Sequence, residues 1–298
     1  MNTNTEIIID SACDLPAEMK EKYKVLPFRI IINEKEYRAG KDIDIQQVYE
    51  HIRKKNYPKT AQVSPHDYKE TFTELAKNKK DCIYLAFSAA MSGSFQTAKL
   101  MANEVKNEYP DFNIEIIDSK AGSTALGLLV NHTKKLLDNG LPLKKVAKII
   151  RAERENLIHL FSLDNLTTLQ RGGRLSKGKA FIGNILNIKP ILEVVDGEIV
   201  LSKKVRGQQR MLKTLITEME NKSQDLSKQI IGISHADDEE LALKLKDKIK
   251  DKYNPDGFLI NMISPVLGAH LGIGGIGIFF FSKPLKLIQT RNCSSNGC

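Results

Sequence analysis

The stretch IYLAFSAAMSGSFQTA, residues 83–98, joins an apolar run to a helical pattern through small and hydroxylated residues. Ile83 to Phe87 are continuously apolar, which predicts a buried strand. Ser92, Gly93 and Ser94 come next, and the apolar residues after them recur at the spacing of a helix face: Phe95, Ala98, Leu100, Met101 and Val105. We therefore expect a strand, a tight turn and a helix in succession.

The turn at 92–94 has two interpretations. The first N–H groups of a helix lack internal partners and carry the positive end of its dipole. Small residues leave room for a ligand there, so Ser92, Gly93 and Ser94 predict a binding point for an anion. Capping of the helix by Ser92 or Ser94 explains the same residues without a ligand, and the segment alone leaves both interpretations open.

The rest of the first half alternates between strand and helix patterns, which is typical of a parallel sheet with its sites at the carboxyl ends of the strands. Strands are expected at 7–9, 25–32, 83–87 and 114–117, and a long helix at 124–138. We predict an α/β fold whose N-terminal parallel-sheet domain covers residues 1–160.

The second half has a mixed pattern. Asp196–Gly197 lies between two apolar segments, 192–195 and 198–201, which predicts a hairpin. Further strands are expected at 230–234, 258–263 and 276–281, the last two flanking a glycine-rich loop, SPVLGAHLGIGG. We predict a mixed α+β domain over residues 161–283, followed by a tail, 284–298.

Composition narrows the class of protein. The chain has 298 residues, 41% of them hydrophobic, and no uncharged apolar stretch approaches the roughly 20 residues that span a membrane. No signal-peptide pattern, zinc spacing or disulfide framework is visible, so we expect a cytoplasmic protein without a bound metal. The net charge of +9 is scattered among acidic residues, and only 6% of residues are aromatic, which argues against nucleic-acid binding.

Four polar segments are expected to gather at one edge of the fold: 10–14, 59–65, 88–94 and 268–275. They bring hydroxyl groups together with His270, which lies between glycines. A serine hydrolase or acyltransferase could use Ser92 or Ser94 with His270 as its base and Asp10 or Asp118 as the orienting acid. The same cradle would also suit a sugar phosphate.

Two basic segments lie in the second half. LQRGGRLSKGK, residues 169–179, carries Arg171, Arg174, Lys177 and Lys179 on a glycine-rich loop. KKVRGQQR, residues 203–210, adds Lys203, Lys204, Arg206 and Arg210. Such clusters are either solvated surface or binding points for carboxylate, phosphate or an acidic partner.

The motifs together resemble the DegV family of bacterial fatty-acid-binding proteins. The matching segments occur in family order between residues 7 and 281: DSACDLP (10–16), KTAQVSP (59–65), SAAMSGSFQTA (88–98), DSKAGSTALGLLV (118–130), LQRGGRLSK (169–177), ILNIKPIL (185–192) and GAHLGIGGIG (268–277). The chain departs from the usual family pattern at Ala61, Val63 and Ile273, which bears on acyl preference.

The resemblance implies a non-catalytic carrier without a cofactor. One long-chain fatty acid would lie in an apolar tunnel between the two domains, and a separate ATP-dependent fatty acid kinase would phosphorylate its carboxylate. By motif, the carboxylate contacts would be Thr60, Ser92, Gly93, Ser94 and His270, with Arg171 nearby. Arg174, Lys203, Lys204 and Arg206 are the candidates for docking the kinase by charge. Candidate tunnel walls, each of which also fits ordinary core, are Leu126, Leu128, Phe181, Ile182, Leu186 and Ile263.

Overall fold

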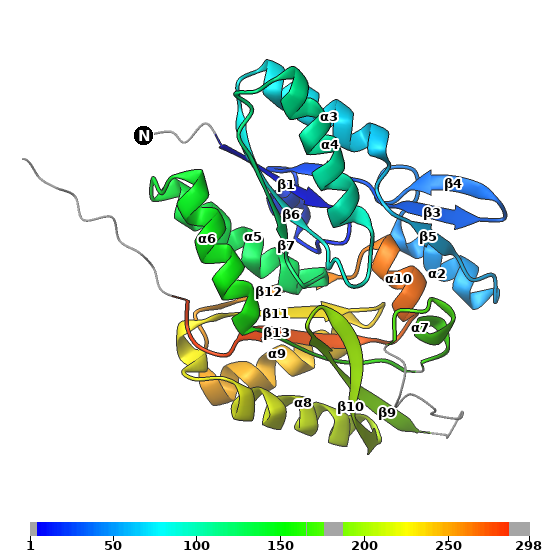
Figure 1. Cartoon of the computed structure of the whole chain (residues 1–298). Coiled ribbons are helices and arrows are strands. Elements are labelled where there is room, and N and C mark those ends of the chain that lie inside the picture. Colours follow the sequence, from blue (N-terminus) through cyan, green and yellow to red (C-terminus); the bar gives the residue numbers. More distant parts are fainter. Residues whose placement is uncertain (1–4, 165, 176–186, 286–298) are drawn as a thin grey trace, which may run out of the picture.

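The computed structural model describes residues 5–164, 166–175 and 187–285. Its upper half in Figure 1 is built on a four-stranded sheet in the order β2-β1-β6-β7, in which every neighbouring pair is parallel. Its strands are β1 (Thr5–Asp10), β2 (Lys24–Leu26), β6 (Asp81–Ala86) and β7 (Ile114–Asp118). The helices of this half are α1 (Ala17–Lys20), α3 (Pro65–Lys77), α4 (Ser94–Glu108), α5 (Ser123–Asp138) and α6 (Leu143–Glu153).

A small antiparallel sheet, β4-β3-β5, extends this half to one side. It consists of β3 (Arg29–Ile32), β4 (Lys35–Arg38) and β5 (Lys59–Ala61), with helix α2 (Ile45–Arg53) beside it. The single strand expected at 25–32 is therefore wrong. Pro27 divides it into β2 and β3, which belong to different sheets, and the N–H of Phe28 bonds to the Ser11 hydroxyl instead of continuing a ladder.

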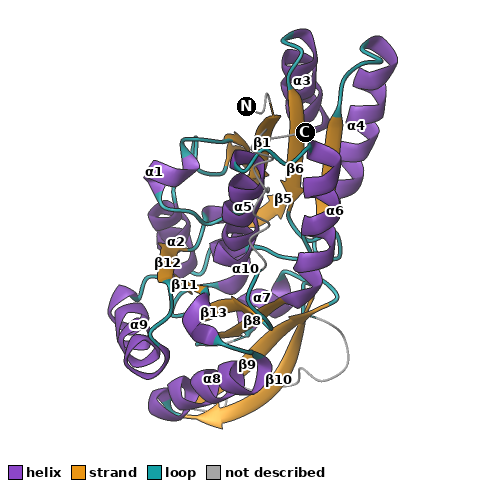
Figure 2. Cartoon of the chain, turned by 90° about the vertical axis from the view of Figure 1, so that its left-hand side faces the viewer, coloured by secondary structure: helices purple, strands orange, loops and turns teal. Residues whose placement is uncertain are grey.

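The lower half is a six-stranded mixed sheet in the order β10-β9-β8-β13-β11-β12, in which only β11 and β12 are parallel. Helices α8 and α9 cover its outer face (Figure 2). Its elements are β8 (Leu157–Ser162), α7 (Thr167–Arg171), β9 (Ile188–Val195), β10 (Glu198–Arg206), α8 (Gln208–Lys222), β11 (Ile230–His235), α9 (Glu239–Tyr253), β12 (Gly257–Met262), α10 (Pro265–Leu271) and β13 (Ile276–Phe281). Two single turns of 3-10 helix, Arg154–Asn156 and Leu226–Lys228, complete this set.

Helix α5 joins the two halves. It lies between the parallel sheet and the inner face of the six-stranded sheet (Figure 1), and most of its residues are buried. Leu126 and Leu129 pack in a core that also holds Ile9 of β1 and Phe279 of β13. The α/β class with a parallel and a mixed sheet is thus confirmed, while the division at residue 160 stays a proposal.

The expected loop at 264–275 contains a helix, α10, so this expectation is wrong. Pro265 at its first position fits a helix start, since the proline ring presets φ and the missing N–H would be unpaired there. Gly272 ends the helix at a φ of 77°, a conformation that favours glycine. The many glycines suggest a loop, but they mark the end of the helix.

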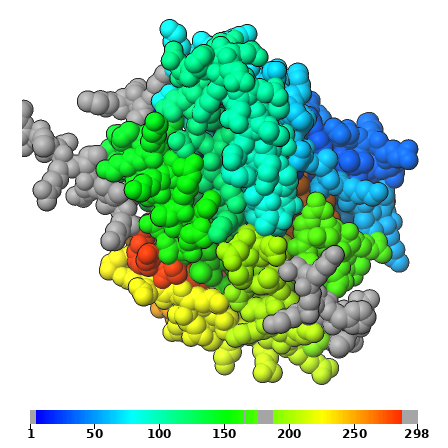
Figure 3. Space-filling view, viewed as in Figure 1, coloured from blue at the N-terminus to red at the C-terminus, as the bar shows by residue number. Residues whose placement is uncertain are grey.

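The hairpin expected at Asp196–Gly197 is confirmed, with Val195 paired to Glu198. Asp196 and Gly197 both have positive φ, as a two-residue hairpin turn requires. The tip of the hairpin crosses to the upper half, where the Ser88 hydroxyl donates to the Gly197 carbonyl at 2.7 Å. Figure 3 shows the yellow-green surface of this hairpin directly below the green and cyan surface of the parallel-sheet half.

Candidate functional site

A cavity lies between the inner face of the six-stranded sheet, helix α10 and the segments that follow β5 and β6. It has about 980 Å³ of space free of protein atoms, part of it open to solvent. Its wall is mostly apolar, with side chains from both halves of the chain: Phe28, Phe87, Met91, Phe161, Leu163, Leu169, Val194, Ile199, Ile263, Val266, Leu267, Leu271, Ile276 and Phe279. Such a space suits an apolar ligand larger than a few atoms.

Thr60 and His270 meet at this cavity although 210 positions separate them in the sequence. Thr60 stands on β5, opposite Ile30 of β3, and His270 stands in the last turn of α10. Thr60 Oγ1 and His270 Nε2 share a hydrogen bond of 2.7 Å, and both residues line the cavity. Burial, and then the positive charge of Arg174, lowers the pKa of His270 to about 4, so the ring is neutral at pH 7.

The neutral ring has a definite chemical use. If Nε2 carries the proton, it donates to Thr60 Oγ1, and the Thr60 hydroxyl hydrogen is then free to bond to a ligand oxygen. With the other tautomer the hydroxyl donates to the ring instead. An acceptor such as a carboxylate favours the first arrangement, because its oxygens need donors.

The turn at 92–94 lies where the sequence predicts, between β6 and α4, but its three residues differ in accessibility. Ser92 lines the cavity, and its hydroxyl accepts from the Ser94 N–H at 3.2 Å. Ser94 is fully buried and Gly93 stands at the helix start without a side-chain cap, and neither belongs to the cavity wall. A Cβ at Gly93 would come within 2.3 Å of Gln62 Oε1, so this glycine lets the 59–65 segment approach the turn.

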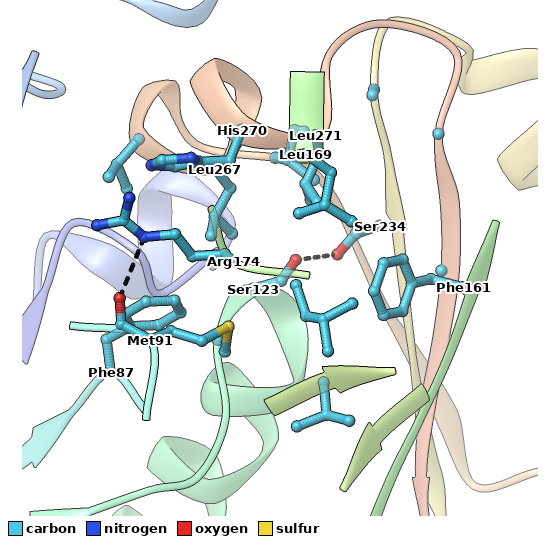
Figure 4. A pocket seen from close by; sticks show the side chains of 18 of the residues that line it. Phe87, Met91, Ser123, Phe161, Leu169, Arg174, Ser234, Leu267, His270 and Leu271 are labelled. Carbon is cyan, nitrogen blue, oxygen red and sulfur yellow. Dashed lines mark hydrogen bonds between the residues drawn. The ribbon is translucent and has the colours of Figure 1, made fainter. Parts of the chain in front are cut away.

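The two arginines of the 169–179 segment lie in different places. The Arg171 guanidinium stacks 4.3 Å from the centre of the Tyr57 ring. Arg174 lines the cavity and reaches between His270 and Met91, whose carbonyl accepts from Arg174 Nε at 3.5 Å (Figure 4). Among the described residues of the wall, Arg174 is the one cationic side chain, so it supplies the positive potential that an anion would find here.

A second polar group, which sequence reasoning did not single out, lies in the wall near α5. The hydroxyls of Ser123 and Ser234 bond to each other at 2.7 Å (Figure 4), and Ser123 also donates to Asp14 at 2.6 Å. Burial raises the pKa of Asp14 to about 6, although its bonds to Ser123 and Ser264 oppose this shift. Asp14 lies in the DSACD segment and Ser123 in DSKAGST, so both residues belong to motifs quoted above, but the sequence did not show that the two side chains are in contact.

His159 of β8 is also part of the wall and was not predicted, because a single histidine in an apolar strand carries no pattern. Of the candidate tunnel walls, Ile263 lines the cavity, whereas Leu126 and Leu128 are core residues of α5. Phe181, Ile182 and Leu186 lie outside the described residues, as do Lys177 and Lys179.

The basic residues of the second cluster lie on the outer side of the lower half. Lys203, Lys204, Arg206 and Arg210 are all exposed. Lys203, Lys204 and Arg210 line a shallow groove between β10 and α8, in which Lys203 pairs with Glu218 at 2.6 Å. Arg174 stands at the cavity and the other three candidates stand on β10, so the four docking candidates lie in two places.

The hydrolase alternative gains no support from this geometry. In the part of the chain that is described, neither Ser92 nor Ser94 bonds to His270, whose Nε2 is engaged by Thr60. Asp10 accepts from Tyr84 and Phe87, and Asp118 from the N–H groups of Ala89 and Lys120, so neither orients the histidine. The described residues hold no cluster of three or more metal-ligating side chains and no helix able to cross a membrane.

The chain resembles proteins of known sequence over almost its whole length. The family model described as "Uncharacterised protein, DegV family" matches residues 4–283. A DegV domain-containing protein of Clostridium perfringens is 34% identical over 279 residues, which are 92% of this chain and 96% of the relative.

Solved structures agree with this match. DegV of Bacillus subtilis, described as a fatty acid binding protein, is 28% identical with a TM-score of 0.82, over 94% of this chain and 99% of that one. A stearic acid-binding protein of Eubacterium ventriosum is 25% identical with a TM-score of 0.85, over 93% and 98% of the two chains. Since the family model covers far more than half of the sequence, the chain belongs to the DegV family.

Proposed function

We propose that this protein binds one long-chain fatty acid in the cavity and presents its carboxylate to an ATP-dependent fatty acid kinase, which forms the acyl phosphate. The observation that carries the proposal is the Thr60–His270 pair beside Arg174 at one part of a mostly apolar cavity. Fatty-acid-binding relatives with the same fold support it. The protein itself would be non-catalytic, free of cofactor and cytoplasmic.

The two ends of such a ligand would be bound by different forces. Each buried methylene contributes about 0.8 kcal/mol, so a tail of about fifteen carbons exceeds roughly 10 kcal/mol before ordering costs. One charge-assisted hydrogen bond contributes about 1.5–3 kcal/mol. The tail therefore supplies most of the affinity, while Thr60, Ser92 and His270, with Arg174 as the cation, fix the position of the carboxylate. Gly93 and Ser94 shape the turn, and Arg171 stays a candidate contact.

The kinase would meet basic residues at one or both of two places. Arg174 lies at the cavity and could contribute to both tasks, whereas Lys203, Lys204 and Arg206 are exposed on the lower half. Active sites that handle ATP hold metal ions in acidic side chains, so basic rims on the carrier favour encounter.

The first test is the ligand content of the purified protein. We expect a solvent extract, analysed by gas chromatography, to contain close to one fatty acid per chain. An extract without fatty acid, together with no uptake of added oleate or palmitate, would refute the proposal.

The second test addresses the polar end. Thr60→Ala, Ser92→Ala and His270→Ala should each slow acyl-phosphate formation by a purified fatty acid kinase, with less effect on thermal unfolding. Wild-type turnover in all three variants would show that the carboxylate is bound elsewhere.

A further inference from the structure

His159 places an imidazole among the mostly apolar side chains of the cavity wall. It stands on β8 opposite Phe279 of β13, and the two rings meet edge to face with centroids 5.7 Å apart. Only 5% of the residue is exposed, and it lines the cavity together with Phe161 and Phe279 of the same sheet face.

Both ring nitrogens of His159 lack a hydrogen-bond partner among the described residues. Burial lowers the pKa of His159 to about 4. The nearby Leu157 backbone opposes this shift, although it forms no hydrogen bond of normal geometry with the ring. A neutral imidazole has one N–H donor and one acceptor nitrogen, so His159 offers one of each. Of the wall's other hydroxyls, those of Ser123 and Ser234 bond to each other, whereas that of Ser162 on β8 has no partner among the described residues.

The ligand's carboxylate is not a suitable partner for His159. A carboxylate needs a cation or several donors, whereas His159 is neutral and carries a single donor. The cation of the wall, Arg174, lies beside His270. A neutral group that can either donate or accept one hydrogen bond, within an otherwise apolar chain, fits better, and an aliphatic hydroxyl has this property.

We infer that His159 is a second polar binding point in the acyl site, where it receives a hydroxyl carried on the chain of a hydroxy fatty acid. The inference rests on the proposed function and adds a ligand class to it. An unsubstituted chain leaves both nitrogens of His159 unpaired, whereas a hydroxyl at the right carbon pairs with one of them, either by accepting from the N–H or by donating to the other nitrogen. A buried nitrogen left without a partner makes an unsubstituted chain bind less tightly than the matching hydroxy acid.

The test compares stearate with a panel of monohydroxystearates, including the 3-, 6-, 9-, 10- and 12-hydroxy isomers, on delipidated protein. The measured quantity is the ratio of the dissociation constants of stearate and each isomer. In His159→Phe the ratio for the best isomer should fall at least tenfold below its wild-type value, with stearate binding retained. His159→Gln keeps a donor and an acceptor and should preserve much of the preference.

His132→Phe is the matched control. His132 is also buried, has an unpartnered Nε2 among the described residues and a pKa lowered to about 4 by burial, but it lies on α5 outside the cavity wall. Its substitution should leave every ratio unchanged.

The outcomes separate the two proposals. Unchanged ratios for every isomer in His159→Phe would overturn the inference. A wild-type protein that favours no isomer over stearate would also overturn it, and this result is expected if a water molecule bonds to His159 instead of a ligand hydroxyl. If His159→Phe does not fold, ¹⁵N NMR of the His159 ring nitrogens in the wild-type protein is the test. Their chemical shifts should change when the best isomer binds and not when stearate binds. Equal changes with both ligands would overturn the inference. Failure to bind stearate or any isomer would refute the fatty-acid proposal itself.

Discussion

Gly172→Ala should displace His270 without changing any group that touches a ligand. A Cβ built on Gly172 would lie 2.2 Å from His270 Nδ1 and 3.1 Å from Cε1, whereas ordinary contact begins at 3.4 Å. Gly172 has a φ of −69°, so alanine introduces no backbone strain there. The whole effect of the substitution is therefore the collision with the imidazole ring.

The magnitude follows from these distances. The His270 ring and the Gly172 backbone must separate by more than 1 Å to restore ordinary contact, and we expect the side chain to take up most of this shift. A shift of that size away from Gly172 breaks the 2.7 Å bond between Thr60 and His270 or forces α10 to move with the ring. If the pair binds a carboxylate, the loss is one charge-assisted hydrogen bond, about 1.5–3 kcal/mol, which is roughly ten- to a hundredfold in affinity.

The assay is displacement of a fluorescent fatty acid from delipidated protein by palmitate, with kinase turnover measured in parallel. Gly257→Ala is the control, because its Cβ would meet nothing nearer than Ile230 Cγ1 at 4.0 Å. We expect Gly172→Ala to weaken binding at least tenfold and Gly257→Ala to leave it unchanged. Wild-type palmitate affinity and turnover in a folded Gly172→Ala protein would refute the role given to His270.

Three further predictions test the hairpin, a buried histidine and the basic surface. Gly197→Ala, whose Cβ would lie 2.5 Å from Ser88 Oγ, should lift the β9–β10 tip and speed fatty-acid release severalfold in stopped-flow displacement. Gly140→Ala is the control, because Gly140 has a similar positive φ, 77° against 84° at Gly197, but no neighbour within 4 Å, and it should not change the release rate. Since the pKa of His132 falls from 6.5 to about 4 on folding, stability is lost as pH drops through this window. His132→Leu should therefore shrink the difference in urea unfolding free energy between pH 8 and pH 5 by about 2 kcal/mol, and an unchanged difference would contradict the assignment. Arg206→Glu should slow kinase turnover and flatten its salt dependence while bound fatty acid stays in place, and unchanged rates for charge reversals in both basic clusters would exclude docking by charge.

Local patterns predicted most of the secondary structure, because the strands and helices are strongly patterned. The 83–98 stretch forms β6, the turn and α4, and Asp196–Gly197 forms its hairpin. The expectations failed at glycine and proline residues, which occur in loops but also at the ends of helices and strands. In 264–275 they begin and end a helix, and at Pro27 they separate two strands that a run of apolar residues had joined.

The candidate site was predictable as a set of residues but not as an arrangement. Thr60, Ser92 and His270 were chosen from motifs, and the structure brings them to one cavity wall. Spacing could not show that Arg174, and not Arg171, enters this wall, because the two differ by less than one helical turn and point to different neighbours. Nor could it find His159, whose significance arises only from the strands beside it.

In the proposed function, the apolar wall supplies most of the binding affinity and the polar end positions the carboxylate for the kinase, so variants of the two parts should have different effects. Since the tail supplies most of the affinity, loss of the Thr60–His270 pair leaves a protein that still retains fatty acid during purification. The carboxylate would then sample several positions, and phosphoryl transfer depends steeply on alignment of the attacking oxygen. Variants of the polar end should thus lower turnover more than ligand content, whereas Val194→Asp, which places a charge in the apolar wall, should lower ligand content first. Equal losses of content and turnover in both kinds of variant would mean that the cavity binds and presents its ligand through the same contacts.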